Sequence, residues 1–228
     1  MSPIILVGTI TVVVLSITTH EAAHGFVADR LGDPTARKLG RLTLNPIPHI
    51  DPFFTILLPA MLILFGSRII FGGAKPVPIN VSLLRNPRHD WALVGAAGPI
   101  ANVLIAFILA AVLSLMIHTD LWTHSSSGTE IFVIGIFVNV LLAIFNLIPV
   151  PPLDGSRVVQ YFLPPQAREF YSSLEKFGLL IIVAMVFFLP GFQAALFGII
   201  LAGVSIISHI FGISADVIYV LQVLLPAG

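Results

Sequence analysis

The chain has 228 residues, of which 57% are hydrophobic and only 10% are charged, and its mean hydropathy is +1.03. This composition excludes an ordinary soluble domain and indicates a protein that crosses a membrane several times. The net charge is zero, so no overall basic surface suggests a nucleic-acid partner. The chain has no cysteine, so any metal ion must be held by histidine, aspartate or glutamate.

Five apolar segments are long enough to cross a hydrocarbon core of roughly 30 Å. They are residues 3–28, 91–117, 130–149, 174–190 and 192–211. A sixth apolar stretch, residues 51–66, is shorter and contains Pro59, so it fits a re-entrant or interfacial hairpin at least as well as a crossing. The tail from residue 214 is expected to form a short interfacial helix. The first segment lacks the basic start of a signal peptide, so we expect it to be retained.

The positive charges predict which way the chain faces. All eleven Lys and Arg fall within residues 30–41, 68–88 and 157–176, whereas the loop 118–130 carries acidic residues but no Lys or Arg. The positive-inside rule makes the three basic windows cytoplasmic. Two of these windows flank residues 51–66, which favours the hairpin for that stretch.

The sequence THEAAHGFVAD, residues 19–29, places His20, Glu21 and His24 at the inner end of the first apolar segment. Residues four apart share one helix face, so the two imidazoles can bind one metal ion. Glu21 lies one step around the helix and can act as general base towards water, as in HExxH metalloproteases. Ionisable residues at membrane depth are costly, which favours a functional site over a merely polar helix end.

Catalytic zinc commonly takes three protein ligands and leaves one position open, so a third ligand must come from elsewhere. The candidates at suitable depth are Asp154, His49 and Asp51, with Asp90 less well placed. Asp154 lies in NLIPVPPLDG, residues 146–155, where three prolines stop any helix and stiffen the backbone. The same residues are also typical of an ordinary turn.

A peptide bond inside a helix is poorly exposed, so its hydrolysis in a membrane requires the substrate to unwind. Either the alternating residues 40–44 (GRLTL) or the glycine- and proline-rich residues 71–80 (FGGAKPVPIN) are expected to form a short β-strand beside the metal that pairs with the substrate. Gly72 and Gly73 are the residues we expect to approach it.

Three motifs together carry a resemblance to a known family. HEAAH in the first segment, GPIAN (98–102) in the second and NLIPVPPLDG after the third resemble the site-2 protease family of intramembrane zinc metalloproteases. The resemblance covers residues 3–165 and is to the small prokaryotic branch, without PDZ or CBS domains. It implies His20, His24 and Asp154 as ligands of one Zn²⁺ per chain and Glu21 as the catalytic base.

The resemblance also implies roles for three further residues. Asn146 is expected near the metal, where its amide would hold substrate or a developing oxyanion; the alternative is a hydrogen bond at the end of its helix. Asn102 is expected to pack between helices or to support a ligand from the second coordination sphere. His49 would orient a ligand or donate to substrate.

The predicted architecture is an all-α polytopic membrane protein forming a single domain over residues 1–228. It has about five transmembrane helices, the hairpin and short strands near the site, and a core of residues 3–165 followed by two further helices over 174–211. We expect an integral protein of a prokaryotic inner membrane, with its active site towards the cytoplasm and a membrane-anchored protein as substrate. The oligomeric state stays open. The alternatives are a metal or solute transporter and a catalytically silent relative that binds membrane proteins.

Overall fold

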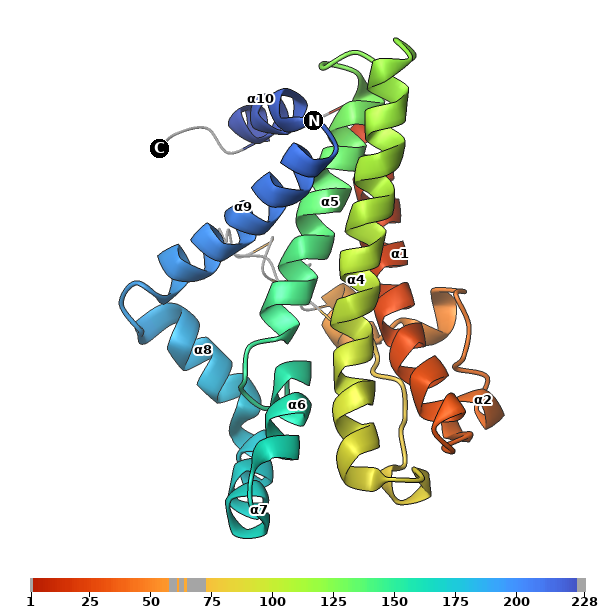
Figure 1. The fold of residues 1–228 in the computed structure, drawn as a ribbon, viewed down its shortest axis with the longest axis vertical. Coiled ribbons are helices and arrows are strands. Elements are labelled where there is room, and N and C mark those ends of the chain that lie inside the picture. The colour runs from red at the N-terminus through yellow and green to blue at the C-terminus, as the bar shows by residue number, and fades with distance from the viewer. Residues whose placement is uncertain (1, 58–60, 62–63, 65–72, 225–228) are drawn as a thin grey trace.

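The computed structural model describes residues 2–57, 61, 64 and 73–224, and helices dominate this part of the chain (Figure 1). The long helices α1 (Pro3–Arg30), α4 (Pro87–His118) and α5 (Ser127–Asn146) run side by side, and α4 packs against both neighbours. The predicted all-α polytopic architecture is confirmed.

Five helical segments are long and apolar enough to cross a membrane, as predicted. Besides α1, α4 and α5 these are α9 (Phe192–Ile210) and the segment Pro165–Phe188. That segment consists of α7 (Pro165–Ser173), the 3-10 turn η4 (Leu174–Phe177) and α8 (Gly178–Phe188). It begins at Pro165 rather than at the expected residue 174, because the polar helix α7 leads into the apolar α8 through the 3-10 turn η4.

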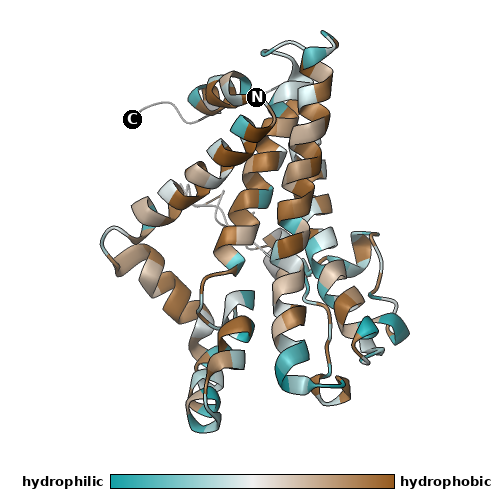
Figure 2. Ribbon diagram, viewed as in Figure 1, coloured by the Kyte–Doolittle hydropathy of each residue, from teal (hydrophilic) through white to brown (hydrophobic). Residues whose placement is uncertain are grey.

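The helix boundaries follow from local sequence. The Ser2 hydroxyl accepts a hydrogen bond from the Ile5 amide at the start of α1, and Ser126 accepts one from the Thr129 amide at the start of α5. Pro87 opens α4, at a position where its missing N–H has no helical partner to lose. Hydrophobic residues cover the bodies of the long helices, and hydrophilic residues gather towards the ends of the bundle (Figure 2).

One apolar core lies between α4, α5, α9 and α10 (Ser214–Leu224). Its fully buried members include Leu113, Ile136, Val204 and Val220, one from each helix. This core holds the bundle together at the end remote from the basic residues. The tail thus forms the expected helix over Ser214–Leu224, and α8 and α9 form a V beside α5 (Figure 1).

The prediction of short β-strands is wrong for the residues that the structure describes. Residues 40–44 form a turn followed by bends, and residues 73–80 have no regular structure. Pro76 and Pro78 lack the N–H that a strand ladder needs. Instead, the Arg41 guanidinium donates to the carbonyl oxygens of Lys75 (2.9 Å) and Pro76 (3.4 Å) and fixes this segment locally.

Short helical turns connect α1 to α4. They are α2 (Thr35–Lys38), η1 (Ile47–His49), the π-helix η2 (Pro52–Leu57) and η3 (Val81–Leu83). Residues 58–60, 62–63 and 65–66 of the stretch 51–66 lie outside the described residues, so the expected hairpin stays a prediction. Gly72 also lies outside them. The last short helix of the core, α6 (Asp154–Phe162), follows α5 and packs against α4.

Candidate metal centre

Helix α1 presents His20 and His24 to α4, one turn apart. The close approach depends on Gly98 of α4: a Cβ atom there would lie 2.5 Å from both His20 Cε1 and His24 Nε2. Any larger residue would occupy the space of the imidazoles. GPIAN therefore supplies more than helix packing, since its glycine forms the wall against which both histidines rest.

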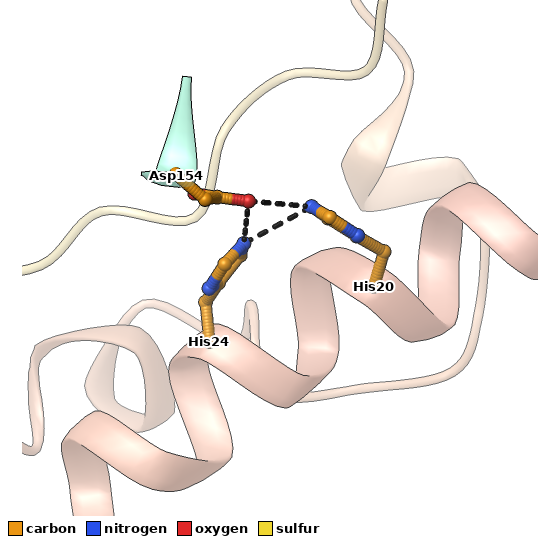
Figure 3. A group of neighbouring side chains, drawn as sticks. All are labelled: His20, His24 and Asp154. Carbon is orange, nitrogen blue, oxygen red and sulfur yellow. Dashed lines mark hydrogen bonds and ion pairs between the residues drawn. The ribbon is translucent and has the colours of Figure 1, made fainter. Parts of the chain in front are cut away.

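Asp154, the first residue of α6, lies against these histidines although it is 134 residues away from His20 in the chain (Figure 3). Its Oδ2 lies 3.1 Å from His20 Nε2 and 3.2 Å from His24 Nε2, and the two Nε2 atoms are 3.1 Å apart. All three residues are at most 6% exposed. Among the described residues, this is the one group of three or more metal-type side chains close enough to share an ion.

The loop after α5 delivers Asp154 to this position. Leu153 caps α6, and Asp154 is the first residue of that helix. The backbone of Gly155 lies so close to the Leu147 carbonyl that no Cβ would fit, which anchors the start of α6 against the end of α5. The proline-rich sequence thus ends in a rigid turn whose carboxylate is aimed at α1.

Asp154 also carries a counter-ion. Arg157 Nη1 lies 3.1 Å from its Oδ1, and the Arg157 guanidinium stacks over the Trp91 ring at 4.5 Å. Burial disfavours the charged carboxylate, but the close contacts with His20 and His24 and the charge of Arg157 outweigh it and hold the pKa of Asp154 below its usual range. The carboxylate is therefore ionised and suited to binding a cation.

The other nitrogen of each imidazole has a fixed partner. His20 Nδ1 donates to Asn102 Oδ1 (2.5 Å), and His24 Nδ1 donates to the Val94 carbonyl (2.6 Å). Because both partners are oxygen acceptors, both histidines carry their proton on Nδ1 when neutral, and the Nε2 lone pairs point at Asp154. This arrangement orients metal-ligating histidines in other proteins.

Asn102 belongs to a chain of buried polar groups. Its Nδ2 donates to Asn139 Oδ1 (2.8 Å), and Asn139 Nδ2 donates to Ser16 Oγ (2.8 Å) and to the Gly135 carbonyl (2.9 Å). Both asparagines are fully buried. Sequence analysis overlooked Asn139 and Ser16, although an amide in the middle of an apolar span is the kind of signal that marks a functional position.

Glu21 points away from this chain of amides and towards residues 73–80. Its Oε2 accepts a hydrogen bond of 2.9 Å from the Val77 amide. Val77 is buried, and its side chain lies against Gly25 of α1, where a Cβ would come within 3.1 Å of Val77 Cγ1. Since Pro76 and Pro78 have no N–H, Val77 supplies the one amide donor of this tripeptide.

The other three residues considered as a third metal ligand are hydrogen-bonded elsewhere. The carboxylate of Asp90 accepts the Asn86 amide (2.7 Å), and that of Asp51 accepts the Phe53 amide (2.9 Å). His49 Nε2 donates to the Thr43 carbonyl (3.0 Å).

The two remaining residues singled out from the sequence take part in local bonds. Asn146 donates through Nδ2 to the Leu142 carbonyl of its own helix (2.9 Å), and the Gly73 carbonyl accepts from Thr55 Oγ1 (2.5 Å). The described contacts thus bring His20, His24 and Asp154 together, with Asn102 behind His20, and record neither Asn146 nor His49 in that group.

The three side chains fit zinc. A tetrahedral ion with bonds of about 2.0–2.1 Å separates its ligand atoms by about 3.3 Å, and the three separations here are 3.1, 3.1 and 3.2 Å. Two neutral imidazoles and one carboxylate form a usual catalytic zinc set and leave a fourth position open. The site therefore has the donor types, spacing and supporting hydrogen bonds that a zinc ion requires.

Comparisons with known proteins point to one family. A family model described as Peptidase family M50 matches residues 115–189. The chain is 41% identical over 176 residues to "Putative zinc metalloprotease YwhC" of Bacillus subtilis, covering 75% of this chain and 76% of that protein. It is 30% identical over 189 residues to "Putative zinc metalloprotease Rip2" of Mycolicibacterium smegmatis, covering 80% of this chain and 69% of that protein. No solved structure matches the chain significantly.

Proposed function

Because the chain belongs to peptidase family M50 and is a zinc metalloprotease, we propose that it hydrolyses peptide bonds in or near the transmembrane segments of membrane-anchored proteins. The observation that carries this proposal is the depth of the cluster within α1. His20 lies ten residues before Arg30, the last residue of that helix, which is about 15 Å along its axis. A substrate must therefore reach the site inside the bundle.

His20, His24 and Asp154 would hold the zinc ion. A bound zinc ion supplies Lewis acidity towards a carbonyl oxygen and lowers the pKa of water. Asn102 and the Val94 carbonyl keep the two imidazoles in the tautomer that binds through Nε2, and Arg157 fixes the Asp154 carboxylate through Oδ1. The protein thus contributes a rigid, buried and pre-oriented set of donors.

Glu21 would carry the proton during hydrolysis. Its carboxylate takes a proton from the attacking water as the C–O bond forms, and then passes it to the amide nitrogen as the C–N bond breaks. The Val77 amide occupies Oε2, so we assign the proton to Oε1. Asn146 keeps a second N–H beside the one given to Leu142, and we propose that it donates to the developing oxyanion.

We also propose that the site faces the cytoplasmic side of a prokaryotic cell membrane. The helices α2, α6 and α7 lie at one end of the bundle (Figure 1), and they carry four of the basic residues: Arg37, Lys38, Arg157 and Arg168. A fifth, Lys176, lies in η4, which follows α7. The loop at the opposite end has no Lys or Arg. This asymmetry follows the positive-inside rule.

The substitution Glu21→Gln tests the proposed activity. The purified protein is reconstituted in vesicles with single-span model substrates, and cleavage and zinc content are measured together. Since a general base contributes roughly 10²–10⁴-fold to rate, we expect cleavage to fall by at least about 100-fold while zinc per chain stays unchanged. Glu169→Gln, at an exposed glutamate of α7, is the matched control. Cleavage by Glu21→Gln at the rate of the wild type contradicts the proposal.

A further inference from the structure

A cavity of about 560 Å³ lies between the first turn of α4 and the helices α6 and α7, at the basic end of the bundle. Three arginines line it: Arg88, Arg157 and Arg168. Among the described residues of its lining, Glu175 is the one carboxylate. The cavity therefore has an excess of positive charge, and none of the proposed catalytic steps uses it.

Two of the arginines have spare donors. Arg88 uses Nε and Nη2 to bond the carbonyl of Tyr161, and Arg168 uses Nε for that of Gln160; both also reach the Leu163 carbonyl through Nη2. These bonds satisfy the last carbonyl groups of α6. Neither Nη1 has a hydrogen-bond partner among the described residues, so both guanidinium groups keep N–H donors for a ligand.

The start of α4 also borders the cavity. Asn86 and Pro87 at its N-terminus line it, but the carboxylate of Asp90 in the first turn already accepts the Asn86 amide (2.7 Å), so the arginines supply the positive charge. The Gln160 side-chain amide supplies a neutral donor to the same space, whereas the Ser172 hydroxyl donates to Gln160 Oε1 (3.3 Å). The lining is thus complementary to a phosphate group, which arginine binds with particularly good geometry.

The surroundings of the cavity identify the source of that phosphate. Phe162, Phe170 and Phe177 lie on the elements that form its wall, α6, α7 and η4, and are 73%, 70% and 52% exposed. In a protein that spans the membrane, exposed phenylalanine rings contact lipid, and basic residues beside them on the proposed cytoplasmic side lie near the headgroups. Basic pockets between helices at this level bind anionic lipid headgroups.

We propose that the cavity binds the phosphate of an anionic phospholipid headgroup. Arg157 links this ligand to the metal centre, because its Nη1 bonds Asp154 Oδ1 while Asp154 Oδ2 meets both histidines. A headgroup bound beside Arg157 adds a second anion for the same guanidinium. The cavity thereby connects membrane composition to the metal-binding carboxylate.

The substitution Gln160→Glu tests the proposal with little change of shape. It puts a negative charge into the cavity while keeping every arginine, and the Ser172 hydroxyl retains an oxygen acceptor at this position. Gln166→Glu makes the same change at an exposed residue of α7 outside the lining and serves as the matched control. The full-length protein in detergent is titrated with dioctanoyl phosphatidylglycerol, dioctanoyl phosphatidylcholine or inorganic phosphate, and native mass spectrometry gives each apparent Kd.

We expect wild type and Gln166→Glu to bind phosphatidylglycerol alike and more tightly than phosphatidylcholine. Gln160→Glu should bind it about fivefold to tenfold more weakly, the effect of roughly one charge near the membrane surface. Equal affinity of Gln160→Glu and wild type for phosphatidylglycerol overturns the proposal, as does equal affinity of wild type for the two lipids. Inorganic phosphate binding as tightly as phosphatidylglycerol overturns the lipid as the source.

Discussion

Replacing Gly98 by alanine adds one methyl group at the point where α4 touches the metal centre. The new Cβ would lie 2.5 Å from His20 Cε1 and His24 Nε2 and 2.6 Å from His20 Nε2, whereas ordinary contacts are 3.4–4 Å. Both imidazoles must therefore move by about 0.9 Å relative to α4, the difference between 2.5 and 3.4 Å. Zinc ligands tolerate only about 0.2 Å.

The expected loss is confined to metal binding and activity. Changing a residue that merely supports a ligand weakens metal affinity about 10–100-fold, so displacing a ligand itself should weaken zinc affinity by about 100-fold or more. Alanine is also favoured over glycine inside a helix by about 1 kcal/mol, so the metal-free protein should keep its thermal midpoint within a few degrees. Gly98→Ala should therefore weaken zinc binding without lowering the stability of the metal-free protein.

Zinc affinity is measured by competition with a chromophoric chelator, beside cleavage and thermal unfolding of the metal-free protein. Gly198→Ala is the matched control, because this helical glycine of α9 has nothing within 4 Å of an added Cβ. It should bind zinc and cleave as the wild type does. If Gly98→Ala binds zinc with the affinity of the wild type, α1 and α4 do not meet at the histidines as described.

Two further substitutions test the supports of the site. Asn139→Leu removes the amide that holds Asn102, so we expect about 10–100-fold weaker zinc binding in the same competition assay and about 1–3 kcal/mol lower stability by thermal unfolding; unchanged zinc affinity would exclude a role for this bond. Gly155→Ala drives a methyl into the Leu147 carbonyl, which is backbone and cannot yield, so a loss of about 1–3 kcal/mol in stability together with loss of zinc is expected. A protein with normal stability and zinc content would show that α6 does not begin against α5.

Much of the fold could be predicted because hydropathy alone defines a membrane span. Five segments were expected and five helical segments of sufficient length and hydropathy are found. The fourth extends back to Pro165, since α7 is too polar to be recognised as part of a span from hydropathy. Residues 40–44 and 73–80 form no strand. Pro76 and Pro78 lack the N–H that a ladder needs, and the carbonyl oxygens of Lys75 and Pro76 accept from the Arg41 side chain instead.

The geometry of the candidate site was predictable where it depends on helix periodicity. The spacing of His20 and His24 places both on one face of α1 in any helix. The spacing does not reveal which helix packs against that face, so the contact with Gly98 and the chain from Asn102 to Asn139 emerge only in three dimensions. The hydrogen-bond partner of Glu21 could not be predicted from the sequence either, because Val77 is 56 residues away in the chain.

The most direct test of the central claim is X-ray absorption spectroscopy at the zinc edge, performed on wild type and on Asp154→Ala with zinc content measured in the same samples. We expect one zinc ion per chain, bound in the wild type by two imidazole nitrogens and a carboxylate oxygen. Asp154→Ala should lose most of its zinc, because one of three protein donors is removed. Equal zinc content and an identical spectrum in the two proteins would contradict the claim that Asp154 shares an ion with His20 and His24.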